Sequence, residues 1–114
     1  MKPRRGDIWL VRFPFTDLAS TKVRPALVLA VHREDIIFVG IFSRPHPSPL
    51  RRTWLRIPSS HPAFRRTGLK KSSVLKAEKL AVIHESVLVR RLGRLPPSLF
   101  REAQQLVKLA LHLP

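Results

Sequence analysis

Residues 6–31, GDIWLVRFPFTDLASTKVRPALVLAV, predict the first part of a β-sheet. Two apolar runs, residues 8–13 and 25–31, are rich in the β-branched and aromatic residues that suit a pleated sheet. Pro14 ends the first run, because proline cannot donate a hydrogen bond to a neighbouring strand. We therefore expect a strand, a long loop and a second strand. Arg24 directly precedes Pro25, so its backbone is expected to be extended at the junction of loop and strand, where solvent and a ligand can reach it.

A hairpin buried on both faces is predicted next. The apolar run at residues 36–42 follows the run at 25–31 after only four polar residues, and neither run alternates cleanly. Prolines at positions 45, 47 and 49 end this strand in an exposed loop. Further short strands are expected at residues 54–57, 73–75, 80–83 and 87–95. Between them, residues 58–72 are expected to form a basic loop, and residues 76–79 either a bulged continuation or a turn.

A C-terminal helix is predicted to begin at Pro96-Pro97, since proline is favoured at the first helical position. An apolar stripe recurs at intervals of three and four residues along it: Leu99, Phe100, Ala103, Leu106, Val107 and Ala110. Leu109, Leu111 and Leu113 widen this stripe beyond what one sheet contact needs. Either the helix is clamped from two sides or it meets a second subunit. The whole chain, residues 1–114, is short enough to form a single domain.

The charge of the chain favours a polyanionic partner. Lys and Arg number 22 against 7 acidic residues, a formal charge of +15, and nucleic acid is the first candidate. An arginine-rich surface of the thermophile type is the alternative, although the acidic half of its ion pairs is missing. The chain has no cysteine, no export signal and no apolar segment near the roughly 20 residues that span a bilayer. A cytoplasmic location without membrane contact is expected.

The polar residues argue against metal and cofactor chemistry. The five histidines form no HxxxH pair, and the acidic residues are scattered. The sequence also lacks the glycine-rich and GxSxG motifs of nucleotide-binding and acyl-transfer enzymes. Basic loops with neighbouring aromatic rings suit single-stranded RNA, which is bound through stacked bases and phosphates. The rings available for stacking, unless they belong to the core, are Phe15, Phe42, Trp54 and Phe64.

Several motifs resemble those of one protein family. They are Gly6-Asp7-Ile8-Trp9, Phe13-Pro14-Phe15, the segment KVRPALVL at residues 22–29, Gly68-Leu69, Ser73-Val74-Leu75 and Leu92-Gly93-Arg94-Leu95. In order and spacing they resemble the PemK/MazF toxins of bacterial type II toxin-antitoxin systems. The resemblance implies a mainly β fold, a small SH3-like (CcdB/MazF-type) antiparallel barrel with a C-terminal α-helix. It also implies a homodimer and an acidic antitoxin protein that neutralises the toxin.

The resemblance implies catalytic residues as well. The arginine before the proline of the second strand serves the phosphate in this family, and here it is Arg24. A threonine hydroxyl at the end of the third strand is the second catalytic group, but this chain reads Phe42-Ser43, so Ser43 offers the nearest hydroxyl. A glutamine that follows an acidic residue in many members is replaced by Lys79.

The favoured function is therefore a metal-independent, sequence-specific endoribonuclease toxin that cleaves single-stranded RNA. The predicted RNA-binding residues are Lys22, Arg44, Arg51, Arg52, Arg65, Arg66, Lys70 and Lys79. One alternative is a catalytically impaired RNA-binding member of the same fold. Another is a CcdB-like toxin that acts on a protein target.

Overall fold

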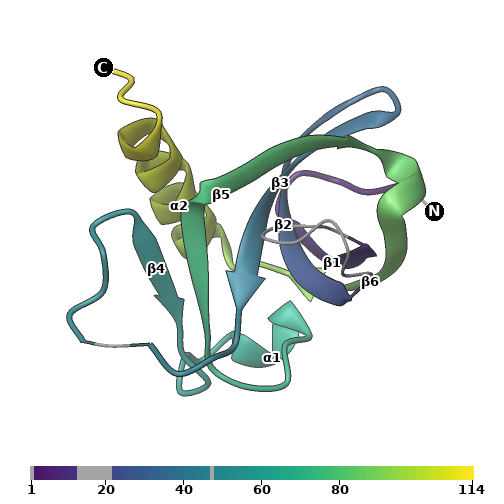
Figure 1. The fold of residues 1–114 in the computed structure, drawn as a ribbon. Coiled ribbons are helices and arrows are strands. Elements are labelled where there is room, and N and C mark those ends of the chain that lie inside the picture. The colour runs from purple at the N-terminus through teal and green to yellow at the C-terminus, as the bar shows by residue number, and fades with distance from the viewer. Residues whose placement is uncertain (1, 13–21, 47) are drawn as a thin grey trace.

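The computed structural model describes residues 2–12, 22–46 and 48–114. In this part of the chain a curved sheet carries one long helix (Figure 1). In chain order, the elements are β1 (Asp7–Arg12), β2 (Val23–His32), β3 (Asp35–Phe42), β4 (Trp54–Ile57), α1 (Phe64–Thr67), β5 (Ser73–His84), the 3-10 helix η1 (Glu85–Val87), β6 (Leu88–Arg94) and α2 (Pro97–Ala110). The prediction that Phe15 stacks on RNA lies outside the described residues.

The six described strands form one antiparallel sheet in the order β4-β5-β3-β2-β1-β6. The predicted hairpin is confirmed: β2 and β3 pair from Ala26 opposite Gly40 to His32 opposite Asp35. The sheet curls strongly, and β5 arches from the neighbourhood of α2 across the molecule (Figure 1). The predicted mainly β fold with a C-terminal helix is therefore confirmed. Within the described residues the sheet is not closed into a barrel, since β4 and β6 remain its edges.

Of two further stretches, the first takes one of the two forms that the sequence left open, and the second differs from the expectation. The short strands expected at residues 73–75 and 80–83 are parts of one strand, β5, and residues 76–79 form its bulged continuation. The bulge appears as a register shift in the pairing with β3 between Val39 and Ile41. The loop expected at residues 58–72 contains the single helical turn α1, which the sequence analysis missed.

Both faces of the sheet are buried. Neighbouring residues on the central strands point to opposite faces, so each strand contributes side chains to two cores. Leu27 belongs to the core between the sheet and α2, which also contains Ala103 and Val107 of the helix. The next residue, Val28, belongs to a second core on the opposite face, together with Phe38. Each fully buried side chain of this size contributes roughly 1.5–3 kcal/mol relative to an exposed one. No helix in the described part of the chain is long and apolar enough to cross a membrane.

Asp7 fastens the N-terminal segment to β6. Its carboxylate is 1% exposed and accepts hydrogen bonds from Arg94 Nη1 at 2.7 Å, the Arg4 backbone N–H at 2.9 Å and Trp9 Nε1 at 3.3 Å. Arg91 Nε lies 3.4 Å from the same carboxylate. The aspartate of the Gly-Asp-Ile-Trp motif therefore has a structural role, and Arg91 and Arg94 compensate its buried charge.

Two glycines allow α1 to pack directly on β6. A Cβ atom on Gly68, whose φ is +72°, would lie 2.1 Å from the Leu92 carbonyl oxygen, and one on Gly93 would lie 2.1 Å from the Arg66 carbonyl oxygen. Only glycine permits such an approach, and at Gly68 it also permits the left-handed backbone that ends α1. The contact fixes where the arginines of α1 project.

Candidate functional site

Arg24 and Phe42 meet at one end of the sheet. Beyond the pair Ala26 and Gly40, the antiparallel register carries β2 to Arg24 and β3 to Phe42, two residues further on each strand. The Arg24 guanidinium carbon lies 5.9 Å from the centre of the Phe42 ring, within the range of a cation–π contact. Arg24 is half-buried at the second position of β2, so the strand begins two residues earlier than the predicted run that starts at Pro25.

Lys76 lies between two aromatic rings. Its ammonium nitrogen is 4.5 Å from the centre of the Phe42 ring and 4.4 Å from the Trp54 ring. Trp54 pairs with Lys76 across β4 and β5, whereas Phe42 pairs with Val74, so Lys76 reaches Phe42 diagonally. Burial, together with the charges of Lys79 and Arg51, lowers the pKa of Lys76 from its usual value. Arg24 and Lys76 thus bring two positive charges to one ring.

Glu78 holds the Trp54 side of this arrangement. Its carboxylate accepts hydrogen bonds of 2.7 Å from the indole N–H of Trp54 and 2.7 Å from the Thr53 hydroxyl. Arg51 Nη1 lies 3.2 Å from the same carboxylate and its guanidinium carbon 4.8 Å from the Trp54 ring centre. Burial alone would raise the pKa of Glu78, but the bonds from Thr53, Trp54 and Arg51 lower it below the usual value. Trp54 is therefore fixed through its only polar atom.

His46 completes the cluster. Its ring meets the Trp54 ring edge-on, with 5.5 Å between centres and 80° between planes. Burial, together with the charges of Lys76 and Arg56, lowers the pKa of His46 below the usual histidine value. A neutral histidine accepts a proton, so this side chain suits a general base.

Ser43 lines two pockets, one of which is also lined by His46. The first, the His46 pocket, has a volume of about 220 Å³ and is lined by Ser43, His46, Arg44, Arg56 and Ser73, among others. The second, the central pocket, measures about 260 Å³, and its polar and charged lining residues are Ser43, Lys70, Lys71, Ser73 and Arg90. Ser43 is exposed and follows directly on β3.

The predicted RNA-binding residues are distributed over several places. Arg44 lines the His46 pocket, Lys70 lines the central pocket and Arg51 packs on Trp54. Lys79 acts on the cluster through its charge on Lys76. Arg66 lines a third pocket near α2, and the remaining three, Lys22, Arg52 and Arg65, are exposed.

The aromatic residues divide in a similar way. Phe42 and Trp54 are half-buried, and both rings contact the Lys76 ammonium group. Phe64 packs against the core between the sheet and α2. Sequence analysis missed Lys76, His46 and the clamp at Glu78. Lys76 and Glu78 reach Phe42 and Trp54 through pairing between segments more than twenty residues apart, and the sequence alone carries no signal for it.

The chain is similar to known proteins in sequence pattern and in fold. The family model described as "PemK-like, MazF-like toxin of type II toxin-antitoxin system" matches residues 4–111. The chain belongs to this family. Among the described residues of this PemK/MazF protein, no group of three His, Asp or Glu side chains could hold a metal ion.

Solved structures of MazF-type toxins share the fold. An endoribonuclease in complex with its cognate antitoxin from a mycobacterial species is 20% identical with a TM-score of 0.72, covering 99% of this chain and 98% of that one. MazF from Deinococcus radiodurans is 20% identical with a TM-score of 0.70 and 97% coverage of both chains. The Mycobacterium tuberculosis toxin MazF-mt6 is 19% identical with a TM-score of 0.69, covering 95% of this chain and 98% of that chain.

This PemK/MazF protein differs from the family pattern at the ring that organises its site. The family resemblance assigns the third-strand hydroxyl to a threonine, and the ungapped position is occupied by Phe42. Here the phenyl ring holds Arg24 and Lys76 instead. The acidic residue in the segment after Ser73-Val74 is Glu78, which clamps Trp54.

Proposed function

We propose that this toxin is an endoribonuclease that cleaves single-stranded RNA without a metal ion, at the cluster around Phe42 and Trp54. The observation that carries the proposal is the contact of two cations, Arg24 and Lys76, with the same Phe42 ring. A phosphate in the process of cleavage gains negative charge, and two positive charges held on one ring stabilise it. Solved relatives described as endoribonucleases give independent support.

The reaction uses the nucleophile of the substrate itself. The ribose 2'-oxygen attacks the adjacent phosphorus, the bond from phosphorus to the 5'-oxygen breaks, and the products end in a 2',3'-cyclic phosphate and a 5'-hydroxyl. His46 accepts the 2'-hydroxyl proton, because its lowered pKa keeps the ring neutral at neutral pH. Lys76 donates a proton to the leaving 5'-oxygen, and its lowered pKa makes that transfer easier.

Arg24 and Ser43 have supporting roles in this scheme. The Arg24 guanidinium offers a planar pair of donors to the non-bridging phosphate oxygens. Ser43 donates its hydroxyl to the same group from the edge of the two pockets, in place of the family threonine.

The partners follow from the family and the charge. Relatives from a mycobacterial species and from Deinococcus radiodurans have been solved with their antitoxins. We expect an acidic antitoxin segment to fold onto the basic surface of this chain and to exclude RNA. A homodimer and a cytoplasmic location belong to the same proposal.

The test is digestion of a mixed RNA pool by purified toxin that is free of antitoxin, in the presence of EDTA. We expect short-sequence cleavage with cyclic phosphate ends. One alternative has a specific observation in its favour: Phe42 stands where the family has a catalytic threonine, which fits a protein that binds RNA without cutting it. RNA that is bound but left intact, with or without magnesium, would establish that alternative.

A further inference from the structure

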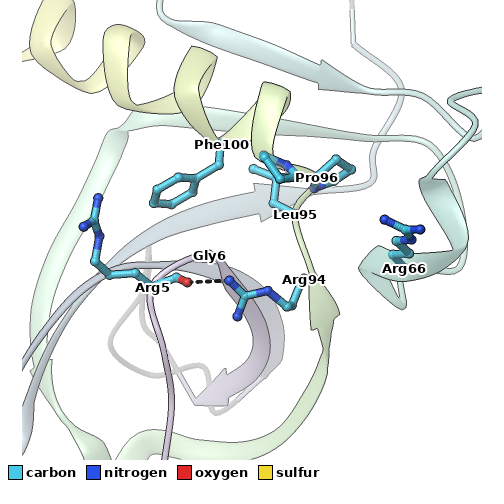
Figure 2. Close-up of a pocket in the computed structure, with 8 residues that line it drawn as sticks. Arg5, Gly6, Arg66, Arg94, Leu95, Pro96 and Phe100 are labelled. Atoms are coloured by element: carbon cyan, nitrogen blue, oxygen red, sulfur yellow. Dashed lines mark hydrogen bonds between the residues drawn. The ribbon is translucent and has the colours of Figure 1, made fainter.

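The pocket beside Phe100 is a built, positively charged site far from Arg24 along β1. It has a volume of about 460 Å³, and the side chains of Arg5, Arg66 and Arg94 surround an apolar floor that includes Pro96 and Phe100 (Figure 2). These arginines come from three separate segments: the N-terminal residues, α1 and the end of β6. We call it the Phe100 pocket.

Two of these arginines are held in place. Arg94 donates to Asp7 Oδ1 at 2.7 Å. It also donates to the Arg5 carbonyl oxygen at 3.0 Å (Figure 2). The Arg5 guanidinium carbon lies 5.6 Å from the centre of the Phe100 ring. The backbone of Arg66 is fixed by its close approach to Gly93. A ligand therefore meets two guanidinium groups, those of Arg94 and Arg5, that need little ordering on binding.

The helix N-terminus does not create this charge. Pro96 is the N-cap of α2 and Pro97 is its first residue, and neither has a backbone N–H to offer to an anion. The attraction comes from guanidinium groups, which match the oxygens of a phosphate in pairs.

The Phe100 pocket shares no lining residue with the two pockets at Ser43, but it lies next to the central pocket at the contact between α1 and β6. The His46 pocket and the central pocket share Ser43 and Ser73. At α1 and β6 the central pocket is lined by Gly68 and Leu92, and the Phe100 pocket by residues two positions away on the same segments, Arg66 and Arg94. The three pockets therefore follow one another around the contact between α1 and β6.

The side chains that line these three pockets are neutral or basic, and one of the cations, Arg94, is paired with Asp7. None of the described residues that line the three pockets is acidic. The cations along them, in order, are Arg44, Arg56, Lys70, Lys71, Arg90, Arg66, Arg94 and Arg5. Single-stranded RNA repeats its negative charge at every nucleotide and also brings bases that pack on aromatic rings. An acidic peptide, which intersperses apolar side chains, fits such a series of cations less well.

We propose that the RNA bound at Arg24 and Lys76 continues through the central pocket and places a distal nucleotide in the Phe100 pocket. The inference rests on the proposed function. Arg24 pairs with Val11, and β1 from Val11 back to Asp7, where the turn containing Arg5 begins, spans about 13 Å of extended chain. A substrate must therefore be several nucleotides long to reach both ends, and the Phe100 pocket sets affinity for long RNA rather than the chemistry of cleavage.

The test compares RNA lengths in a variant that removes the two exposed arginines, Arg5→Gln with Arg66→Gln. Arg94 is left intact because it also neutralises Asp7. The probes are 2'-O-methyl oligonucleotides of about 4 to 14 nucleotides, which lack the nucleophile and stay uncut. Fluorescence anisotropy over a range of salt concentrations gives the affinity, and Arg101→Gln on the exposed face of α2 is the matched control. Thermal denaturation confirms that each variant folds.

We expect the double variant to bind the longest oligonucleotides at least tenfold more weakly, with unchanged binding of the shortest. The slope of log affinity against log salt should fall by about 1.4 for the long probes, from about 0.7 for each of two phosphate contacts. An equal loss at every length, or no more loss than in Arg101→Gln, overturns the inference. So does a loss seen only with a synthetic acidic peptide. If the wild type binds no oligonucleotide at all, the proposed function fails as well, whereas normal binding without the length effect refutes this inference alone.

Discussion

The Lys76 ammonium lies 4.5 Å from the centre of the Phe42 ring, at the place where the family resemblance expects a hydroxyl. A phenyl ring cannot donate a hydrogen bond, but its face attracts cations. Arg24 approaches the same ring from β2, so Phe42 brings together charges from two strands that are not neighbours in the sheet. Where the family has a threonine hydroxyl, this chain therefore has a phenyl ring with the Lys76 ammonium group beside it.

Replacing Arg24 by alanine should abolish cleavage without unfolding the protein. A cation at the beginning of a strand stabilises charge in the transition state, and the loss of one such donor costs about 2.7–4 kcal/mol. Arg24→Lys should restore little, because an ammonium group cannot reproduce the two parallel hydrogen bonds of a guanidinium. Single-turnover cleavage rates measure both effects, with thermal denaturation as the check on folding. Wild-type rates in Arg24→Ala would remove this residue from the mechanism.

Lys76→Met should lower the cleavage rate by about 10²–10³-fold, as expected for the loss of one charged donor at the phosphate. Lys76→Arg tests the second role of the residue. Arginine keeps the positive charge but does not titrate in the accessible range, so the alkaline limb of the rate profile should disappear. The measurement is cleavage rate against pH for the wild type and both variants. An alkaline limb that survives in Lys76→Arg would assign the proton transfer to another group.

The difference between what the sequence predicts and what it misses follows from the range of the interactions. The β2–β3 hairpin and α2 are specified locally, by two apolar runs around a polar turn and by a proline start with an apolar stripe. In contrast, α1 is a single turn without a side-chain cap, and it exists where Gly68 and Gly93 let it touch β6. Its stability comes from a contact that is distant in sequence.

In the candidate site, too, some residues can be recognised from the local sequence and others only from strand pairing. Arg24 is recognisable because Pro25 follows it directly, and Ser43 because it ends a strand. Lys76 is recognisable only from the register of β4 and β5, which places it opposite Trp54. The bulge at residues 76–79 lies in the pairing of β5 with β3, and it interrupts the alternation on which strand prediction depends.

Substitution of His46 by glutamine should remove the acid limb of the cleavage profile. Burial and the charges of Lys76 and Arg56 lower the pKa of His46, so the neutral base should persist to a pH below the usual histidine value of about 6.5. The wild-type rate should therefore fall only below that pH. Ser43→Ala is the companion variant and should cost only the net value of one hydrogen bond, about 1 kcal/mol, at every pH. An unchanged acid limb in His46→Gln would exclude the histidine as the base.

We predict a symmetric dimer in solution. Leu109, Leu111 and Leu113 near the C-terminus are 40%, 51% and 54% exposed in the single chain, a grouping that monomers usually cover. Static light scattering at micromolar concentration should give twice the chain mass. The variant with glutamine at all three positions should shift towards the monomer, whereas Arg101→Gln on the same helix should not. A wild-type monomer in both low and high salt would contradict the prediction.

Glu78→Gln should destabilise the fold at neutral pH and lose its effect in acid. The wild-type carboxylate accepts hydrogen bonds from Trp54, Thr53 and Arg51, which together lower its pKa below the usual value. A group with a lowered pKa in the folded state contributes stability above its unfolded pKa, and that contribution disappears as the pH falls through the folded value. The carboxylate is partly open to water, so we expect a difference of about 1–2 kcal/mol at pH 7. Urea denaturation between pH 7 and pH 3 measures it: the wild-type and Glu78→Gln curves should converge as the pH falls, and a constant gap would mean that packing, rather than the charge of Glu78, holds Trp54 in place.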